Sequence, residues 1–160
     1  MLAELVISQK ESPRKCTLTP FRRDPRFRVH WFNPFRPVPV AGGVLLHPDG
    51  PPLAPAEVEA GLILVDGSWR YAARMVKNLV GTFVPRSLPP GLATAYVRRA
   101  RGGTDPATGL ASIEALYGAL WLAEKAPPDL LAAYRWREEF LALNAEWFAR
   151  HRATTSGGSV

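Results

Sequence analysis

Hydrophobic residues along the chain fall into short blocks with two different spacings. Blocks rich in Leu, Val and Ile, and a block in which apolar residues alternate with basic ones, predict strands, because successive side chains on a strand point to opposite faces. The block 62–65 is apolar throughout, which is typical of a strand buried on both faces. The predicted strands cover residues 2–8, 27–32, 43–47, 62–65 and 93–98.

Other blocks repeat every three or four residues and predict helices. The first opens with Pro55, a residue favoured at the first helical position, and another begins near Ser112, which we expect to be its N-cap. The predicted helices cover residues 55–60, 69–79, 112–124 and 129–150. Because a helix separates the strands 62–65 and 93–98, the pattern predicts a parallel α/β sheet. We expect one domain over residues 1–153 and a disordered polar tail over 154–160.

Composition places this domain among soluble proteins. The chain has 160 residues, of which 47% are hydrophobic, enough for a core without a disulfide or a metal. The single cysteine, Cys16, excludes an internal disulfide and a cysteine-rich zinc site, and an unpaired thiol fits a reducing cytoplasm. No apolar run approaches the roughly 18 residues of a membrane span. We therefore expect a cytoplasmic protein that does not contact a membrane.

Charge is concentrated near the start of the sequence. The net charge is +6, and residues 1–40 carry eight basic side chains against three acidic ones. Sixteen of the 20 basic residues are arginine, whose planar fork pairs with phosphate and stacks on bases. The excess favours an RNA partner, although an ordinary basic surface would give the same count.

Candidate chemistry is concentrated at the turn 66–69, Asp-Gly-Ser-Trp, where a buried strand passes into a helix. Ligands of open α/β sheets bind at the carboxyl ends of strands, where Asp66 could accept a hydrogen bond from a ligand or a proton from a nucleophile. A purely structural reading stays open, in which Asp66 or Ser68 caps the helix and Trp69 belongs to the core. The sequence has no glycine-rich dinucleotide motif, and its three histidines lack metal-ligand spacing, so we expect no metal.

Several segments together resemble a known superfamily, which joins the small-subunit rRNA aminocarboxypropyltransferases and the DTW-domain tRNA-uridine aminocarboxypropyltransferases. The patches that resemble the rRNA family are 13–17 (Pro-Arg-Lys-Cys-Thr), 53–57 (Leu-Ala-Pro-Ala-Glu), 61–69 (Gly-Leu-Ile-Leu-Val-Asp-Gly-Ser-Trp), 86–89 (Arg-Ser-Leu-Pro), 134–136 (Tyr-Arg-Trp) and 140–144 (Phe-Leu-Ala-Leu-Asn). Those similar to the DTW family are 66–69, 96–99 (Tyr-Val-Arg-Arg) and 110–115 (Leu-Ala-Ser-Ile-Glu-Ala). The rRNA family's Asn-Pro-Val-Asn-Tyr-Gly stretch and the DTW family's cysteine cluster are absent, so the sequence lies between the two subfamilies.

The resemblance implies a SPOUT-like fold, a parallel sheet flanked by helices with a C-terminal trefoil knot at the cofactor site. It also implies that S-adenosylmethionine (SAM) is the donor and that its 3-amino-3-carboxypropyl group goes to a uridine or pseudouridine of rRNA or tRNA. Asp66 is the candidate catalytic residue, as a general base or as a group that orients the donor. The implied cofactor-binding residues are Thr17, Leu46, Asp66, Ser68, Trp69, Leu88, Tyr96, Leu110 and Ser112.

We expect structured RNA to meet the protein on a surface formed by arginines and a lysine near these loops. The candidate RNA-binding residues are Arg14, Lys15, Arg22, Arg23, Arg26, Arg98, Arg99 and Arg101. Two other functions remain open: a SPOUT-type RNA methyltransferase that uses the same donor, and a non-catalytic basic module for ribosome assembly. The resemblance is compatible with a monomer or a homodimer.

Overall fold

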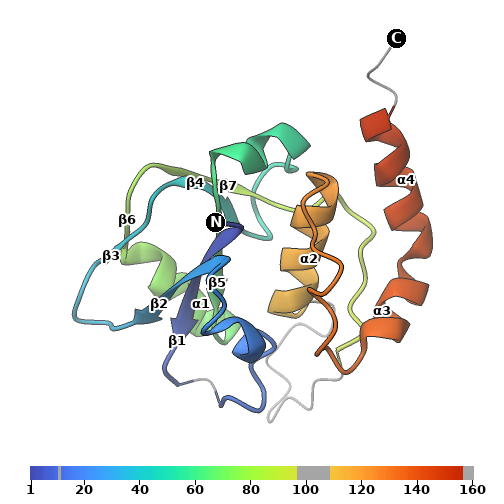
Figure 1. Cartoon of the computed structure of the whole chain (residues 1–160). Helices are drawn as coiled ribbons and strands as arrows, with labels where there is room; N and C mark the ends of the chain where they lie inside the picture. Colours follow the sequence, from blue (N-terminus) through green and yellow to red (C-terminus); the bar gives the residue numbers. More distant parts are fainter. Residues whose placement is uncertain (11, 97–108, 157–160) are drawn as a thin grey trace.

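The computed structural model describes residues 1–10, 12–96 and 109–156, apart from the side chains of Trp69 and residues 153–156. Strands dominate the first half and helices the second (Figure 1). The strands are β1 (Ala3–Ser8), β2 (Phe27–Phe32), β3 (Val38–Pro39), β4 (Gly43–Leu46), β5 (Leu62–Asp66), β6 (Leu79–Val80) and β7 (Phe83–Arg86). The helices are α1 (Trp69–Lys77), α2 (Ser112–Leu122), α3 (Arg137–Leu143) and α4 (Ala145–Ser156), with 3₁₀ turns η1 (Thr19–Phe21) and η2 (Pro55–Ala60).

Five of these strands form one sheet in the order β2-β1-β5-β4-β7, and every pair in it is parallel. The short strands β3 and β6 form a second, two-stranded parallel sheet. The predicted parallel α/β sheet is therefore confirmed. Because the strands are parallel, their carboxyl ends all lie along one edge of the sheet.

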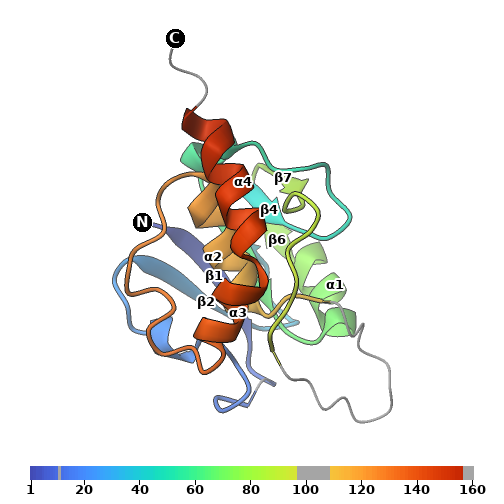
Figure 2. The same ribbon diagram turned by 90° about the vertical axis from the view of Figure 1, so that its right-hand side faces the viewer.

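Each face of the main sheet is covered by helices (Figures 1 and 2). Alternate residues of β1 and β5, such as Leu5 and Leu64, pack with α2 and α4 in the larger core. Their neighbours Val6 and Ile63 pack with Met75 of α1 in a smaller core on the other face. The alternation of a strand thus gives the two faces different partners.

Glycines allow the close approach of β4 and β5 at their starts. Gly43 and Gly61 have φ values of 112° and 118°, which glycine adopts without steric cost. A Cβ atom at Gly61 would lie 2.5 Å from the carbonyl oxygen of Gly42, so any larger residue would push the two strands apart.

The predicted strand 93–98 is wrong over residues 93–96, which have no regular secondary structure; residues 97 and 98 lie outside the described part. The last strand of the sheet is instead β7, which pairs with β4. Its sequence, Phe-Val-Pro-Arg, contains a proline inside the strand, which edge strands tolerate, and β7 is an edge strand.

The predicted helix 129–150 is shorter and interrupted. Turns occupy most of 128–136, α3 begins at Arg137, and Asn144 separates α3 from α4. Asn144 is buried, and its side chain hydrogen-bonds the amide and the carbonyl of Ala93 and donates to the carbonyl of Phe140, so it connects this helical segment to a neighbouring loop. Helix α4 runs to Ser156, into the segment expected as a tail, whereas residues 157–160 are outside the described part. No helix among the described residues is long and apolar enough to cross a membrane.

Candidate functional site

The carboxyl edge of the main sheet brings together segments that are distant in sequence. Strand β5 ends there at Asp66, next to β1, which ends at Ser8, and β4, which ends at Leu46. Strand β7 ends beside β4, and Leu88 follows it two residues later. The predicted cofactor residues Leu46, Asp66 and Leu88 thus lie at the edge where ligands of open α/β sheets bind.

Asp66 is the centre of a hydrogen-bond cluster, which we call the Asp66 cluster: Cys16, Asp66 and Ser112. The Asp66 side chain is on the α2 face of the sheet and the residue is only 8% exposed. The Cys16 thiol donates to Oδ2 over 2.9 Å, and the Ser112 hydroxyl donates to Oδ1 over 2.5 Å. Both carboxylate oxygens are therefore fixed in position by neutral donors.

Cys16 acts in this cluster as a donor. Burial raises the pKa of the Cys16 thiol, the Asp66 carboxylate raises it further, and a hydrogen bond with Arg22 acts in the opposite direction. Because the thiolate is the nucleophilic form of cysteine, a raised pKa leaves this thiol protonated and unreactive near neutral pH. Cys16 lies in the patch 13–17 that resembles the rRNA family, but no role in the site was predicted for it.

Ser112 does not cap α2 as predicted. The N-cap is Ala111, Ser112 is the first helical residue, and its hydroxyl is directed to Asp66. The amide of Ile113 donates to the Thr17 hydroxyl over 3.1 Å. The start of α2 is therefore attached both to β5 and to the loop that contains Cys16, which places Thr17 beside the Asp66 cluster.

From its place in the first turn of α2, Glu114 is expected only to interact favourably with the helix dipole. In the structure it also accepts several hydrogen bonds. It is fully buried, and its carboxylate accepts hydrogen bonds from the Thr94 hydroxyl and from the amides of Ala95 and Ala111. These bonds replace the strand pairing predicted for residues 93–96, because the backbone donors of this segment are satisfied by a side chain.

The remaining predicted cofactor residues lie around this cluster. Tyr96 donates from its hydroxyl to the carbonyl of Lys15 over 3.2 Å and packs edge-on against Trp136. Leu46 and Leu88 are partly buried against the α2-side core, and Leu110 directly precedes the N-cap of α2. Ser68 caps α1, accepting from the amide of Tyr71, as the structural reading of the sequence allowed. Trp69 begins α1, and its side chain lies outside the described part.

The predicted RNA-binding residues differ in their surroundings. Arg14, Lys15 and Arg23 are exposed, and Arg22 packs its guanidinium over the Trp31 ring, 4.9 Å from the ring centre. Arg98, Arg99 and Arg101 lie outside the described residues.

Arg26, another residue of this set, is paired with acidic side chains of the protein. Its guanidinium is paired with Asp24 at 2.7 Å and with Asp129 at 2.8 Å, and it holds the pKa of each carboxyl below its usual range. This arginine therefore connects the segment before β2 to the turn after α2, and its charge is balanced within the protein.

Two comparisons with known proteins give matches. The family model described as "Ribosome biogenesis protein, C-terminal" matches residues 46–160. A solved structure, that of the SAM-dependent rRNA:acp-transferase Tsr3 from Vulcanisaeta distributa, is similar with a TM-score of 0.68 and 26% sequence identity. The match covers 96% of this chain and 85% of the other. No curated protein matches the sequence. Because the family model covers more than half of the chain, this protein belongs to the family of ribosome biogenesis proteins defined by that C-terminal region.

Proposed function

We propose that this protein transfers the 3-amino-3-carboxypropyl group of SAM to a uridine or pseudouridine base of rRNA. The observation that carries the proposal is the likeness to the SAM-dependent rRNA:acp-transferase Tsr3, which extends over 96% of the chain. The family match to ribosome biogenesis proteins supports rRNA over tRNA as the substrate.

The charge of the Asp66 cluster fits SAM. Asp66 is buried, its two described hydrogen-bond partners are neutral, and no ion pair among the described residues includes it. A buried carboxylate without a cationic partner is costly, so it favours a cationic ligand, and SAM carries an ammonium and a sulfonium. No group of three potential metal ligands occurs among the described residues, and the proposal requires no metal.

Bound SAM would supply a carbon activated toward substitution by the neighbouring sulfonium. In our proposal Asp66 orients the donor by accepting from its ammonium, and Cys16 and Ser112 hold the carboxylate in the required direction. Each Asp66 oxygen accepts one hydrogen bond and has a lone pair left for a second, so the carboxylate can accept from the ammonium while both neutral donors stay in place. Leu46, Leu88 and Leu110 would line the apolar part of the donor site, with Thr17, Ser68, Trp69 and Tyr96 around it. Such a site would act by aligning the reactive carbon of the donor with the nucleophile of the RNA base, and orientation of this kind can lower a reaction barrier substantially.

Two finer points also belong to the proposal. We infer a SPOUT-like architecture in which the C-terminal half forms a trefoil knot around this edge of the sheet, and a single SAM-binding domain over residues 1–153. In the sheet, β4 lies between β5 and β7, although β5 and β7 both follow it in sequence. The chain therefore crosses from β5 over β4 to reach β7, which is compatible with a knot.

The product identifies the reaction. Unmodified small-subunit rRNA is incubated with the protein and SAM, digested to nucleosides and measured by mass spectrometry. We expect a gain equal to the aminocarboxypropyl group on one uridine-derived nucleoside. A gain of one methyl group would identify a methyltransferase, and an unmodified product from a protein that binds SAM would refute transfer to this RNA. Asp66→Ala is the control, since it removes the group proposed to orient the donor and leaves the RNA face unchanged.

A further inference from the structure

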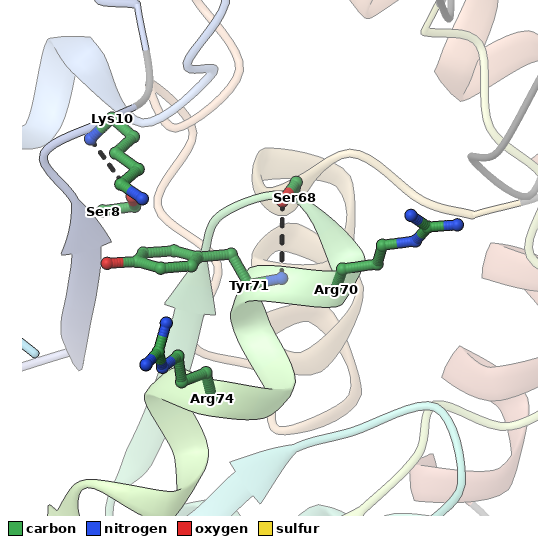
Figure 3. A pocket seen from close by; sticks show the side chains of 6 residues that line it. All are labelled: Ser8, Lys10, Ser68, Arg70, Tyr71 and Arg74. Carbon is green, nitrogen blue, oxygen red and sulfur yellow. Dashed lines mark hydrogen bonds between the residues drawn. The ribbon is translucent and has the colours of Figure 1, made fainter. Parts of the chain in front are cut away.

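A concave site lies at the same edge of the sheet as the Asp66 cluster, between the end of β1 and the first turns of α1 (Figure 3). The cavity has a volume of about 330 Å³, near the lower limit of typical ligand cavities. Its lining residues are Ser8, Lys10, Ser68, Arg70, Tyr71 and Arg74. We call it the Lys10 cavity; only Ser68 is shared with the residues expected to bind the donor.

The Lys10 cavity and the Asp66 cluster lie on opposite faces of the sheet. Ser8 is on the face of β1 that includes Val6 and packs with α1, whereas Asp66 is on the face that includes Leu64 and packs with α2. Only the turn after Asp66 separates them. A Cβ atom at Gly67 would lie 3.1 Å from Met75 Sδ and 3.5 Å from Ser8 Cβ, so this turn is packed tightly between the two sites.

The Lys10 cavity is strongly basic. Three of its six lining residues are cationic and none is acidic. The Lys10 ammonium lies 4.6 Å from the centre of the Tyr71 ring, and the ring is held edge-on by Phe32. Figure 3 shows Lys10 and Arg74 on two sides of that ring, while Arg70 extends in another direction. No ion pair among the described residues includes Lys10 or Arg74.

One of these charges works against the helix. The N-terminal end of α1 carries the positive end of the helix dipole, where acidic residues are favourable and basic ones are not. The first turn of α1 nevertheless contains no acidic residue and includes Arg70, whereas Arg74 lies in the last turn, where a basic residue is favourable. The charge of Arg70 at this end of the helix becomes favourable when an anion is bound nearby.

We propose that the Lys10 cavity binds a backbone phosphate of the rRNA substrate, with Lys10 and Arg74 as its cationic partners. The inference rests on the proposed rRNA transferase function and adds a contact on the α1 face to it. Both side chains are exposed, so they are accessible to a large polyanion. Because the cavity and the Asp66 cluster share one edge of the sheet, an RNA strand that crosses this edge can contact both.

The test measures RNA affinity without SAM, as a function of salt. The double variant Lys10→Ala with Arg74→Ala is compared with Arg137→Ala with Arg150→Ala, which removes the same charge from exposed positions on α3 and α4. The probe is an unmodified small-subunit rRNA transcript. Loss of one hydrogen bond to a charged group predicts at least a roughly tenfold weaker affinity. Loss of one phosphate contact lowers the slope of log affinity against log salt by about 0.7–0.9. In the control variant, both the RNA affinity and the salt slope should change less than in the double variant.

Several outcomes would overturn the proposal: an affinity and a slope equal to those of the control, or a comparable loss of SAM affinity, which would assign the cavity to the donor. Arg74→Lys should retain most of the RNA affinity because the charge remains. If the double variant proves unstable, Arg74→Ala alone gives the answer, since this side chain is exposed. The proposed function can fail separately, because it is judged by the mass of the product and this inference by RNA affinity without the donor.

Discussion

Asp66 accepts hydrogen bonds from a thiol that is 50 residues away in sequence and from a hydroxyl that is 46 residues away. The sequence indicated Asp66 as a candidate because it ends a buried strand. It could not indicate the partners, because nothing in the local pattern around Cys16 or Ser112 specifies which distant group their protons reach. Serine is a residue type that commonly caps helices, so the sequence suggested that role for Ser112. Only the tertiary structure shows that the Ser112 hydroxyl donates to Asp66.

The Cys16 donor can be tested by two substitutions that differ in one property. Cys16→Ser keeps a donor toward Asp66, whereas Cys16→Ala removes it. A hydrogen bond to a charged group contributes about 1.5–3 kcal/mol, so the alanine variant should bind SAM about tenfold more weakly or worse, and the serine variant should stay close to the original affinity. Titration calorimetry with SAM gives both values. Equal affinities for the two variants would show that the thiol does not position Asp66.

Because of Cys16, the stability of the fold should also depend on pH in the alkaline range. Its folded-state pKa is raised above the ordinary value of 9.0, so the folded state retains the proton longer than the unfolded chain. The corresponding stability is fully present below pH 9.0 and is lost as the pH rises through the folded-state pKa. Denaturant titrations between pH 8 and 11 should therefore show a steeper loss for the original protein than for Cys16→Ser. Tyr117, whose pKa burial also raises, contributes equally to both proteins, so only the difference between them is informative.

At the scale of elements, strands and helices with regular hydrophobic spacing were predicted correctly, whereas the prediction was wrong where side chains replace backbone pairing. Residues 93–96 have the composition of a strand, yet Glu114 and Asn144 take the hydrogen bonds that a neighbouring strand would provide. Strand β7 escaped prediction because Pro85 argues against a strand, and its position at the sheet edge is a property of topology.

Glu114 should therefore be essential to the segment 93–95. Glu114→Gln keeps the volume but places an amide where the carboxylate meets donors, which leaves at least one buried donor unsatisfied. The expected loss is about 1–3 kcal/mol in the free energy of unfolding. Chemical denaturation measures it, and Glu124→Gln, an exposed position at the end of α2, is the matched control. A loss no larger than that of the control would mean that the segment is held by other contacts.

Arg26 should act on the fold and not on RNA. Because it lowers the pKa values of Asp24 and Asp129, its stabilising effect is present above their ordinary value of 3.8 and disappears as the pH falls through the lowered values. Arg26→Ala should thus be less stable than the original protein at pH 7, and the two should converge in strong acid. Its RNA affinity should fall less than that of Arg23→Ala, whose side chain is exposed. A larger loss of RNA affinity for Arg26→Ala than for Arg23→Ala would show that Arg26 belongs to the RNA-binding surface.

For the whole molecule, the parallel α/β architecture was predicted because a helix follows the buried strand 62–65 and a further strand was expected beyond it; in the structure the strand of the main sheet after that helix is β7. The sequence did not predict that the Asp66 cluster and the Lys10 cavity would lie on opposite faces of the sheet at the same edge. The alternation of side chains along β1 and β5 decides which of them point to α1 and which to α2. Lys10 and Arg74 line one cavity only because α1 packs beside β1. Arginines four residues apart on a predicted helix were the available sequence signal, since such residues share a helix face.

Binding of the donor should stabilise the whole fold, because the Asp66 cluster connects β5, the loop after β1 and the start of α2. A ligand that binds only the folded state at 100 times its Kd adds about 2.7 kcal/mol to the free energy of unfolding. For a chain of this size that corresponds to a rise in Tm of about 5–10 °C. Thermal melts with saturating SAM, before and after treatment with a chelator, measure it, and we expect the same rise in both because no metal is required. Asp66→Ala should melt at a temperature that SAM does not change. A rise that disappears with the chelator would point to a metal in the donor site, and a rise that persists in Asp66→Ala would place the donor away from this carboxylate.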